Sequence, residues 1–137
     1  MKKILSIFFV AVWAVVSMSS CGGDDEGGSK NESKDNYYVK YIVSNGKQIS
    51  YAARNERTII YTTPEKDNSI ETRQSEWEGT YGPFKKGDKV ILSIRVTMAR
   101  NSTNASISVC KNSEPFAVKA ECSEVKDGAS LHYVIDY

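Results

Sequence analysis

The residue with the clearest chemical role in the sequence is Cys21, whose thiol follows small residues at the end of an apolar segment. Two lysines come first, and a mostly apolar run over residues 4–16 follows. A basic start, a short apolar run and small residues before the cleavage point are the order of a secretory signal peptide. The sequence therefore predicts that residues 1–20 are a signal that is removed on export.

The motif Ser19-Ser20-Cys21-Gly22 resembles the lipobox of bacterial lipoproteins. The resemblance implies that the Cys21 thiol takes a diacylglyceryl group and that Cys21 becomes the mature N-terminus. The alternative is an ordinary cleaved signal that leaves Cys21 as a free thiol. The apolar run is shorter than the roughly 20 residues of a membrane-spanning helix. We therefore expect the protein to be attached to its partner membrane by acyl chains, each buried methylene of which contributes roughly 0.8 kcal/mol of binding free energy.

Residues 21–36 are expected to be the lipidated cysteine and a flexible, acidic tether. No large apolar side chain occurs in residues 22–36, so this segment lacks the surface needed to form a core. As a coil it would span on the order of 20 Å. The cluster Asp24, Asp25 and Glu26 resembles the surface-export signal of Bacteroidetes lipoproteins, which implies a position on the cell surface of the outer membrane. The alternative is that these acidic residues only keep the linker soluble.

Charge and motif content exclude several functions. Removal of Lys2 and Lys3 with the signal reduces the 18 basic residues to 16 against 17 acidic ones, a net charge of about −1, which argues against a nucleic-acid partner. His132 is the single histidine and should point outward from the last strand. Nucleophile elbows, phosphate-binding glycine loops and metal-binding motifs are missing from the sequence. We therefore expect no catalytic residue, no cofactor and no metal.

Residues 37–137 read as one all-β domain of about 100 residues. Apolar and polar residues alternate in short segments that turn signals separate, and no helical period occurs. The pattern predicts an immunoglobulin-like β-sandwich of seven or eight strands. The expected strands are 39–43, 49–53, 57–63, a weaker one at 70–77, 89–98, 105–111, 116–122 and 131–137.

Two connections can be predicted in more detail. A three-residue loop from Ser44 to Gly46 would pair residue 43 with residue 47 and place both apolar sets of a first hairpin on one face. Gly46 would then occupy the position that favours φ > 0. Residues 101–104 read as the tip of a loop between two later strands.

The order of elements resembles the small single-domain lipoproteins of Bacteroidetes and, more distantly, the extracytoplasmic domain of the mycobacterial MmpS family. The resemblance implies the sandwich fold and, as one alternative function, an accessory subunit of an envelope transport complex. MmpS proteins carry a transmembrane helix where this chain has a lipobox. The motifs that carry the resemblance are Tyr38-Val39-Lys40-Tyr41, Asn45-Gly46, Ile60-Tyr61, Trp77, Gly82-Pro83-Phe84-Lys85-Lys86-Gly87, Ile107-Ser108-Val109 and Phe116.

Cys110 and Cys122 allow a disulfide, because export leads to an oxidising compartment. Strand alternation places Cys110 outward and Cys122 with the inward residues of its strand, so a bridge needs a β-bulge. Two separate thiols are the alternative.

Aromatic residues supply the candidate binding surface. Tyr61, Trp77 and Tyr81, with Tyr37 and Tyr38, could form an exposed surface for a sugar ring or a partner protein, because such side chains combine apolar area with a polar tip. The alternative is that Trp77 fills the gap between the two sheets. The leading hypothesis is thus a non-catalytic, lipid-anchored binding or interaction module, and a carbohydrate-binding module is a further alternative.

Overall fold

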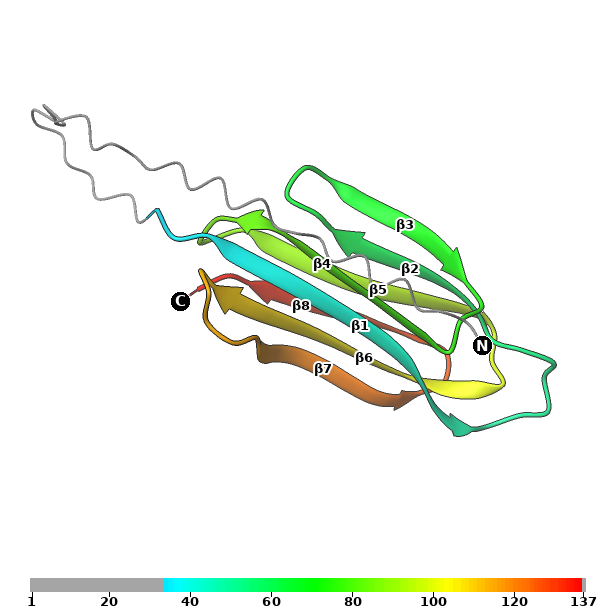
Figure 1. The fold of residues 1–137 in the computed structure, drawn as a ribbon. Helices are drawn as coiled ribbons and strands as arrows, with labels where there is room; N and C mark the ends of the chain where they lie inside the picture. Colours follow the sequence, from blue (N-terminus) through cyan, green and yellow to red (C-terminus); the bar gives the residue numbers. More distant parts are fainter. Residues whose placement is uncertain (1–33, 137) are drawn as a thin grey trace, which may run out of the picture. The chain divides into compact units, whose positions relative to one another are not determined.

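The computed structural model describes residues 34–136, which form two four-stranded antiparallel sheets packed as a sandwich (Figure 1). Sheet A has the order β4-β1-β6-β7, and sheet B has the order β3-β2-β5-β8. The predicted all-β sandwich is confirmed, with eight strands. The strands are β1 (Tyr37–Gln48), β2 (Glu56–Thr62), β3 (Asp67–Thr72), β4 (Glu76–Phe84), β5 (Lys89–Met98), β6 (Asn101–Lys111), β7 (Ala117–Val125) and β8 (Gly128–Val134).

The predicted signal peptide, most of the tether, and the sites at Cys21 and at Asp24, Asp25 and Glu26 lie outside the described residues. Within residues 34–136, no helix is long and apolar enough to cross a membrane.

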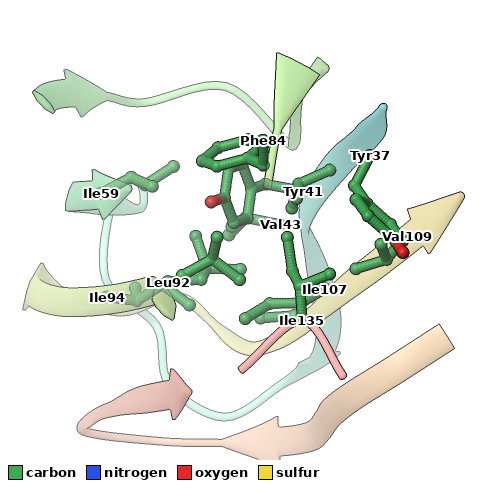
Figure 2. Packing of buried hydrophobic residues seen from close by; sticks show 13 residues of the cluster. Tyr37, Tyr41, Val43, Ile59, Phe84, Leu92, Ile94, Ile107, Val109 and Ile135 are labelled. Atoms are coloured by element: carbon green, nitrogen blue, oxygen red, sulfur yellow. The ribbon is translucent and has the colours of Figure 1, made fainter. Parts of the chain in front are cut away.

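The core lies between the sheets, where alternate residues of facing strands meet. On β5, Val90, Leu92 and Ile94 are buried while Arg95 is exposed, as the alternation predicts. Figure 2 shows Leu92 and Ile94 pointing into the same space as Tyr41 and Ile107 of sheet A. Burying such side chains stabilises each by about 1.5–3 kcal/mol relative to exposure, so this layer is the main force that joins the sheets.

The predicted first hairpin is wrong. β1 continues through Gly46 to Gln48 and pairs with β4 on one side and β6 on the other, so residues 49–55 are a loop. A Cβ atom at Gly46 would overlap the Ser102 hydroxyl of β6. Glycine at position 46 therefore allows β1 and β6 to approach closely, and it does not form a turn. The residue that requires glycine here is Ser102, 56 positions later in the chain.

Other boundaries also differ from the predictions: the last strand, expected at 131–137, is β8 at Gly128–Val134. Residues 101–104, expected at a loop tip, form the start of β6, where Ser102 and Thr103 are 1% exposed. The weak strand at 70–77 is divided between β3 and β4, which belong to different sheets. Strands that are neighbours in sequence thus lie on opposite sides of the core.

The two long sides of the sandwich differ. β7 and β8 approach each other on one side, across the tight turn that joins them. On the other side the edge strands β3 and β4 make no comparable contact. Large side chains must fill this open side, because an empty gap would forfeit packing on both sheets.

Candidate functional site

The open side is filled by an aromatic cluster that joins the two sheets. Tyr61 comes from β2 of sheet B, and Trp77 and Tyr81 come from β4 of sheet A. The ring centroid of Tyr61 lies 4.9 Å from that of Trp77 and 5.0 Å from that of Tyr81. The structure therefore brings together three of the five aromatic residues expected at an exposed surface. The expectation is wrong for Tyr37, which is 1% exposed and belongs to the core.

Tyr41 of β1 supports this cluster from the core side. Its ring lies 6.0 Å from Tyr61 and 6.1 Å from Tyr81, and its hydroxyl donates a 2.7 Å hydrogen bond to the Thr62 carbonyl. Tyr41 is fully buried, whereas the three outer rings are half-buried. The cluster thus packs against the core on one side and reaches solvent on the other.

Trp77 fills the space between the two sheets and does not itself line the cleft beside it. It packs against the core and contacts a ring of the opposite sheet, as an inter-sheet tryptophan does. Its neighbours Tyr61 and Tyr81 also line a cleft. Burial, and then the neighbouring Tyr61 hydroxyl, raise the pKa of Tyr81 to about 12. The Tyr81 hydroxyl therefore stays neutral near pH 7, able both to donate and to accept a hydrogen bond.

The cleft, which we call the aromatic cleft, has a volume of about 590 Å³. This value falls within the roughly 300–1,000 Å³ typical of small-molecule sites. One wall is the end of β4 with Tyr38 beside it, and the other is the loop between β2 and β3. Its lining residues are Tyr38, Tyr61, Thr63, Pro64, Glu65, Lys66, Asn68, Thr80, Tyr81, Gly82 and Pro83.

Two glycines of β4 set the positions of tyrosine rings in this cleft. A Cβ atom at Gly79 would lie 2.7 Å from the Cε2 and Oη atoms of Tyr81. A Cβ atom at Gly82 would lie 2.5 Å from the Cδ1 atom of Tyr38. Each ring therefore occupies the space that the Cβ atom of a larger residue would need, so only glycine at these two positions permits the observed ring positions.

A β-bulge shapes the same wall. Tyr37 pairs with Phe84, but Val39 pairs with Tyr81, so two steps along β1 match three steps along β4. The additional residue on β4 falls in the Gly82-Pro83 segment, opposite Tyr38. Bulges bend a strand and redirect side chains, and they are frequent beside binding sites.

The loop that forms the opposite wall is held by its own hydrogen bonds. The Thr63 amide donates to the Lys66 carbonyl at 2.9 Å, and the Thr63 hydroxyl donates to the same oxygen at 2.8 Å. The Asn68 Nδ2 donates to the Thr63 hydroxyl at 3.1 Å. These bonds fix the loop before any ligand arrives, which reduces the ordering cost of binding.

Polar groups at the rim remain available for a ligand. Among the described residues, no protein hydrogen bond or ion pair engages the carboxylate of Glu65, the ammonium of Lys66 or the hydroxyl of Thr80. The Asn68 side chain uses its nitrogen, not its Oδ1 oxygen, in the loop. The aromatic cleft thus offers a carboxylate, an ammonium, a hydroxyl and an amide oxygen around apolar rings.

The disulfide that the sequence allowed does not form: Cys110 and Cys122 are both free. Cys122 on β7 pairs with Ala105 of β6. Cys110 lies on β6 itself, five residues after Ala105, where it pairs with Tyr38 of β1. Residues that far apart along a strand are beyond the Cα separation that a disulfide bridges. Burial raises the pKa of both thiols, so neither is set up as a thiolate nucleophile.

His132 points outward from β8, as the alternation predicts, and lies 3.0 Å from the Ser130 hydroxyl. Serine with histidine is a pair used for nucleophilic catalysis, but that chemistry also needs a group that orients the histidine. Among residues 34–136, no carboxylate hydrogen-bonds to this histidine, and neither Ser130 nor His132 lines the aromatic cleft. The described residues hold no group of three or more acidic, histidine or cysteine side chains that could bind a metal ion.

A second hollow of about 490 Å³ lies between β2, β3 and β5 of sheet B. Two of its charged groups form an ion pair: Glu56 accepts from Arg73 at 3.0 Å, and it also accepts from the neighbouring Arg54 at 2.6 Å. Its lining residues include no aromatic side chain. The aromatic cleft therefore has the stronger features of a binding site.

Sequence reasoning missed most of the cleft and also a buried polar cluster around Arg57. Arg57 is 3% exposed, and its Nε donates to the Thr103 hydroxyl at 2.9 Å while its Nη2 donates to Asn45 Oδ1 at 2.6 Å. The arginine at an inward position of an alternating strand was the available signal. This cluster joins the sheets at the end remote from the aromatic cleft.

No protein-family model, curated protein or solved structure matches the chain. The chain is therefore described by its fold, a small all-β domain in which two four-stranded antiparallel sheets pack together.

Proposed function

We propose that this chain is a non-catalytic, lipid-anchored binding module of the bacterial envelope, and that it takes its ligand in the aromatic cleft. The main observation behind this proposal is the cleft itself, in which half-buried rings from both sheets lie beside polar groups that have no hydrogen-bond partner among the described residues. Large apolar area beside a few convergent polar groups is the usual composition of a ligand site.

The anchor in this proposal is Cys21, within a motif that resembles a lipobox. Acyl chains on Cys21 would hold the module on the outer membrane, and Asp24, Asp25 and Glu26 would direct it to the cell surface. The cleft would then lie near the anchored end of the domain, because Tyr38 lines it and follows directly after the start of β1.

The non-catalytic part of the proposal rests on the chemistry at the cleft. A general acid and a general base must both reach the reacting atoms. The cleft lining contains Glu65 as its carboxylate and Lys66 as its amine, both on one exposed loop. Glycoside hydrolysis requires two carboxyl groups across the substrate, and the lining supplies one.

Material that co-purifies with the protein from native membranes tests this function. Wild type, Tyr38→Ala and Tyr51→Ala are purified from the same amount of membrane, and the bound protein, glycan and lipid are compared. Tyr51 is the matched control, because it is 99% exposed in the loop at the far end of β1.

We expect wild type and Tyr51→Ala to retain the same material and Tyr38→Ala to lose it. Equal retention by all three proteins contradicts the proposal that the aromatic cleft is the binding site.

A further inference from the structure

The lining of the aromatic cleft also indicates a class of ligand. We propose that the cleft binds a neutral oligosaccharide, an inference that rests on the proposed function.

The rings provide flat apolar surfaces. Tyr38 lies over Gly82, and Tyr81 lies over Gly79, so each ring lies close against the β4 backbone. Tyr61 and Tyr81 are stacked on each other, with 24° between their planes, so the surface left for a ligand is the Tyr38 ring and the parts of this pair that line the cleft. A sugar ring has a face of C–H groups that packs on such a surface, while its hydroxyls remain at the edge for hydrogen bonds.

The rim matches a ligand that carries many hydroxyl groups and no charge. The Glu65 carboxylate and the Asn68 Oδ1 can accept hydrogen bonds, the Lys66 ammonium can donate them, and the Thr80 hydroxyl can do both. One carboxylate and one ammonium stand on the same loop, so the rim has no excess of either sign. An anionic or cationic ligand would gain from one of these groups and lose from the other.

An extended peptide fits the cleft less well. A peptide that adds to an edge strand needs a regular row of free backbone donors and acceptors. Along the cleft, β4 carries Pro83, which has no N–H group, and a bulge that interrupts the ladder.

Titration with defined saccharides tests the proposal. The full-length lipoprotein is purified in a detergent without a sugar headgroup and titrated with hexasaccharides of β-1,4-glucose, β-1,4-xylose, β-1,4-mannose and α-1,4-glucose. Calorimetry gives the dissociation constant. Trp77, 4.9 Å from Tyr61, reports binding by its fluorescence, since the other tryptophan lies in the predicted signal. A pool of unstructured peptides is titrated in parallel.

The variants separate the cleft from the rest of the surface. Tyr38→Ala removes one ring, Gly79→Ala pushes the Tyr81 ring without changing its chemistry, and Tyr51→Ala is the remote control. Circular dichroism establishes that each variant is folded. If one cleft variant fails to fold, the other still tests the proposal.

We expect at least one hexasaccharide to bind, with affinity reduced by at least about tenfold in the cleft variants and nearly unchanged in Tyr51→Ala. Absence of saccharide binding, or equal binding to wild type and both cleft variants, overturns the saccharide assignment. Peptide binding that Tyr38→Ala abolishes, without saccharide binding, also overturns it while leaving the cleft as the binding site. If, in addition, native material is retained equally by wild type and Tyr38→Ala, the proposed function fails as well.

Discussion

The Tyr61 ring of β2 stacks on the Tyr81 ring of β4, with centroids 5.0 Å apart, and thereby links the two sheets where their edges stand open. The pair lies between the buried Tyr41 and the solvent-facing cleft. One interaction thus closes the core and forms the floor of the proposed site. Changes to this pair are expected to affect stability and binding together, so binding variants are better placed at Tyr38, further from the core.

High pH should weaken the fold through Tyr81. Burial raises the pKa of Tyr81 from 10.0 to about 12 in the folded chain. Between these two values the unfolded chain has lost the proton that the folded chain keeps, so stability falls as the pH rises. The contribution is complete below pH 10 and is lost progressively up to about pH 12.

Tyrosinate absorbance against pH, with urea unfolding at each pH, measures this effect. Wild type should show late-titrating tyrosines, and Tyr81→Phe should remove one of them, while Tyr41, whose pKa burial also raises, remains. Simultaneous titration of every tyrosine near pH 10 would show that the buried environment of Tyr81 is described wrongly.

The core prediction compares two faces of β5. Leu92 is fully buried and Arg95 is exposed on the same strand. Leu92→Ala should cost about 2–5 kcal/mol through lost burial and a residual cavity, and Arg95→Ala should cost under about 1 kcal/mol. Chemical denaturation measures both. Similar losses at the two positions would contradict a strand with one buried face.

Lipid attachment predicts that Cys21→Ser accumulates as a larger, unprocessed precursor, because the resemblance to a lipobox implies cleavage only after the thiol is modified. Metabolic labelling with a clickable palmitate, followed by gel electrophoresis, provides the measurement. Label should appear on wild type alone. Equal label on both proteins would exclude Cys21 as the attachment site.

Surface display predicts a difference between wild type and a variant in which Asp24, Asp25 and Glu26 are all alanine. The variant should keep its lipid but remain on the inner leaflet of the outer membrane. Protease added to intact cells should therefore digest wild type and spare the variant. Protection of wild type, or equal digestion of both proteins, argues against the surface position.

The parts of the fold that depend on local pattern were predictable from sequence. The alternation in β5 and β8 identifies both strands and their buried faces, because neighbouring side chains of a strand point to opposite sides. The predicted loop from Ser44 to Gly46 is wrong, because the need for glycine at position 46 comes from Ser102 on another strand. Residues 101–104 have the composition of a loop, but they begin β6. The Asn101 amide donates to the Asn55 side chain, a contact with a distant residue that local composition does not predict.

The candidate site was predictable in its residue types and not in its shape. Tyr61, Trp77 and Tyr81 stood out as aromatic residues, but their meeting depends on how two sheets pack. The role of Gly79 and the wall formed by the loop at 63–66 follow from contacts between segments that are separate in sequence. Contacts between distant segments produce no local periodicity in the sequence, so they cannot be predicted from a sequence pattern.

Photo-crosslinking in intact cells tests the central claim, that the aromatic cleft is where this protein binds. A benzophenone amino acid replaces Thr80 at the rim of the cleft, and in a matched control it replaces Thr97, which is exposed in the second hollow. After illumination, the account predicts a discrete adduct at position 80 and none at position 97. No adduct at position 80, or the same adduct at both positions, would contradict it.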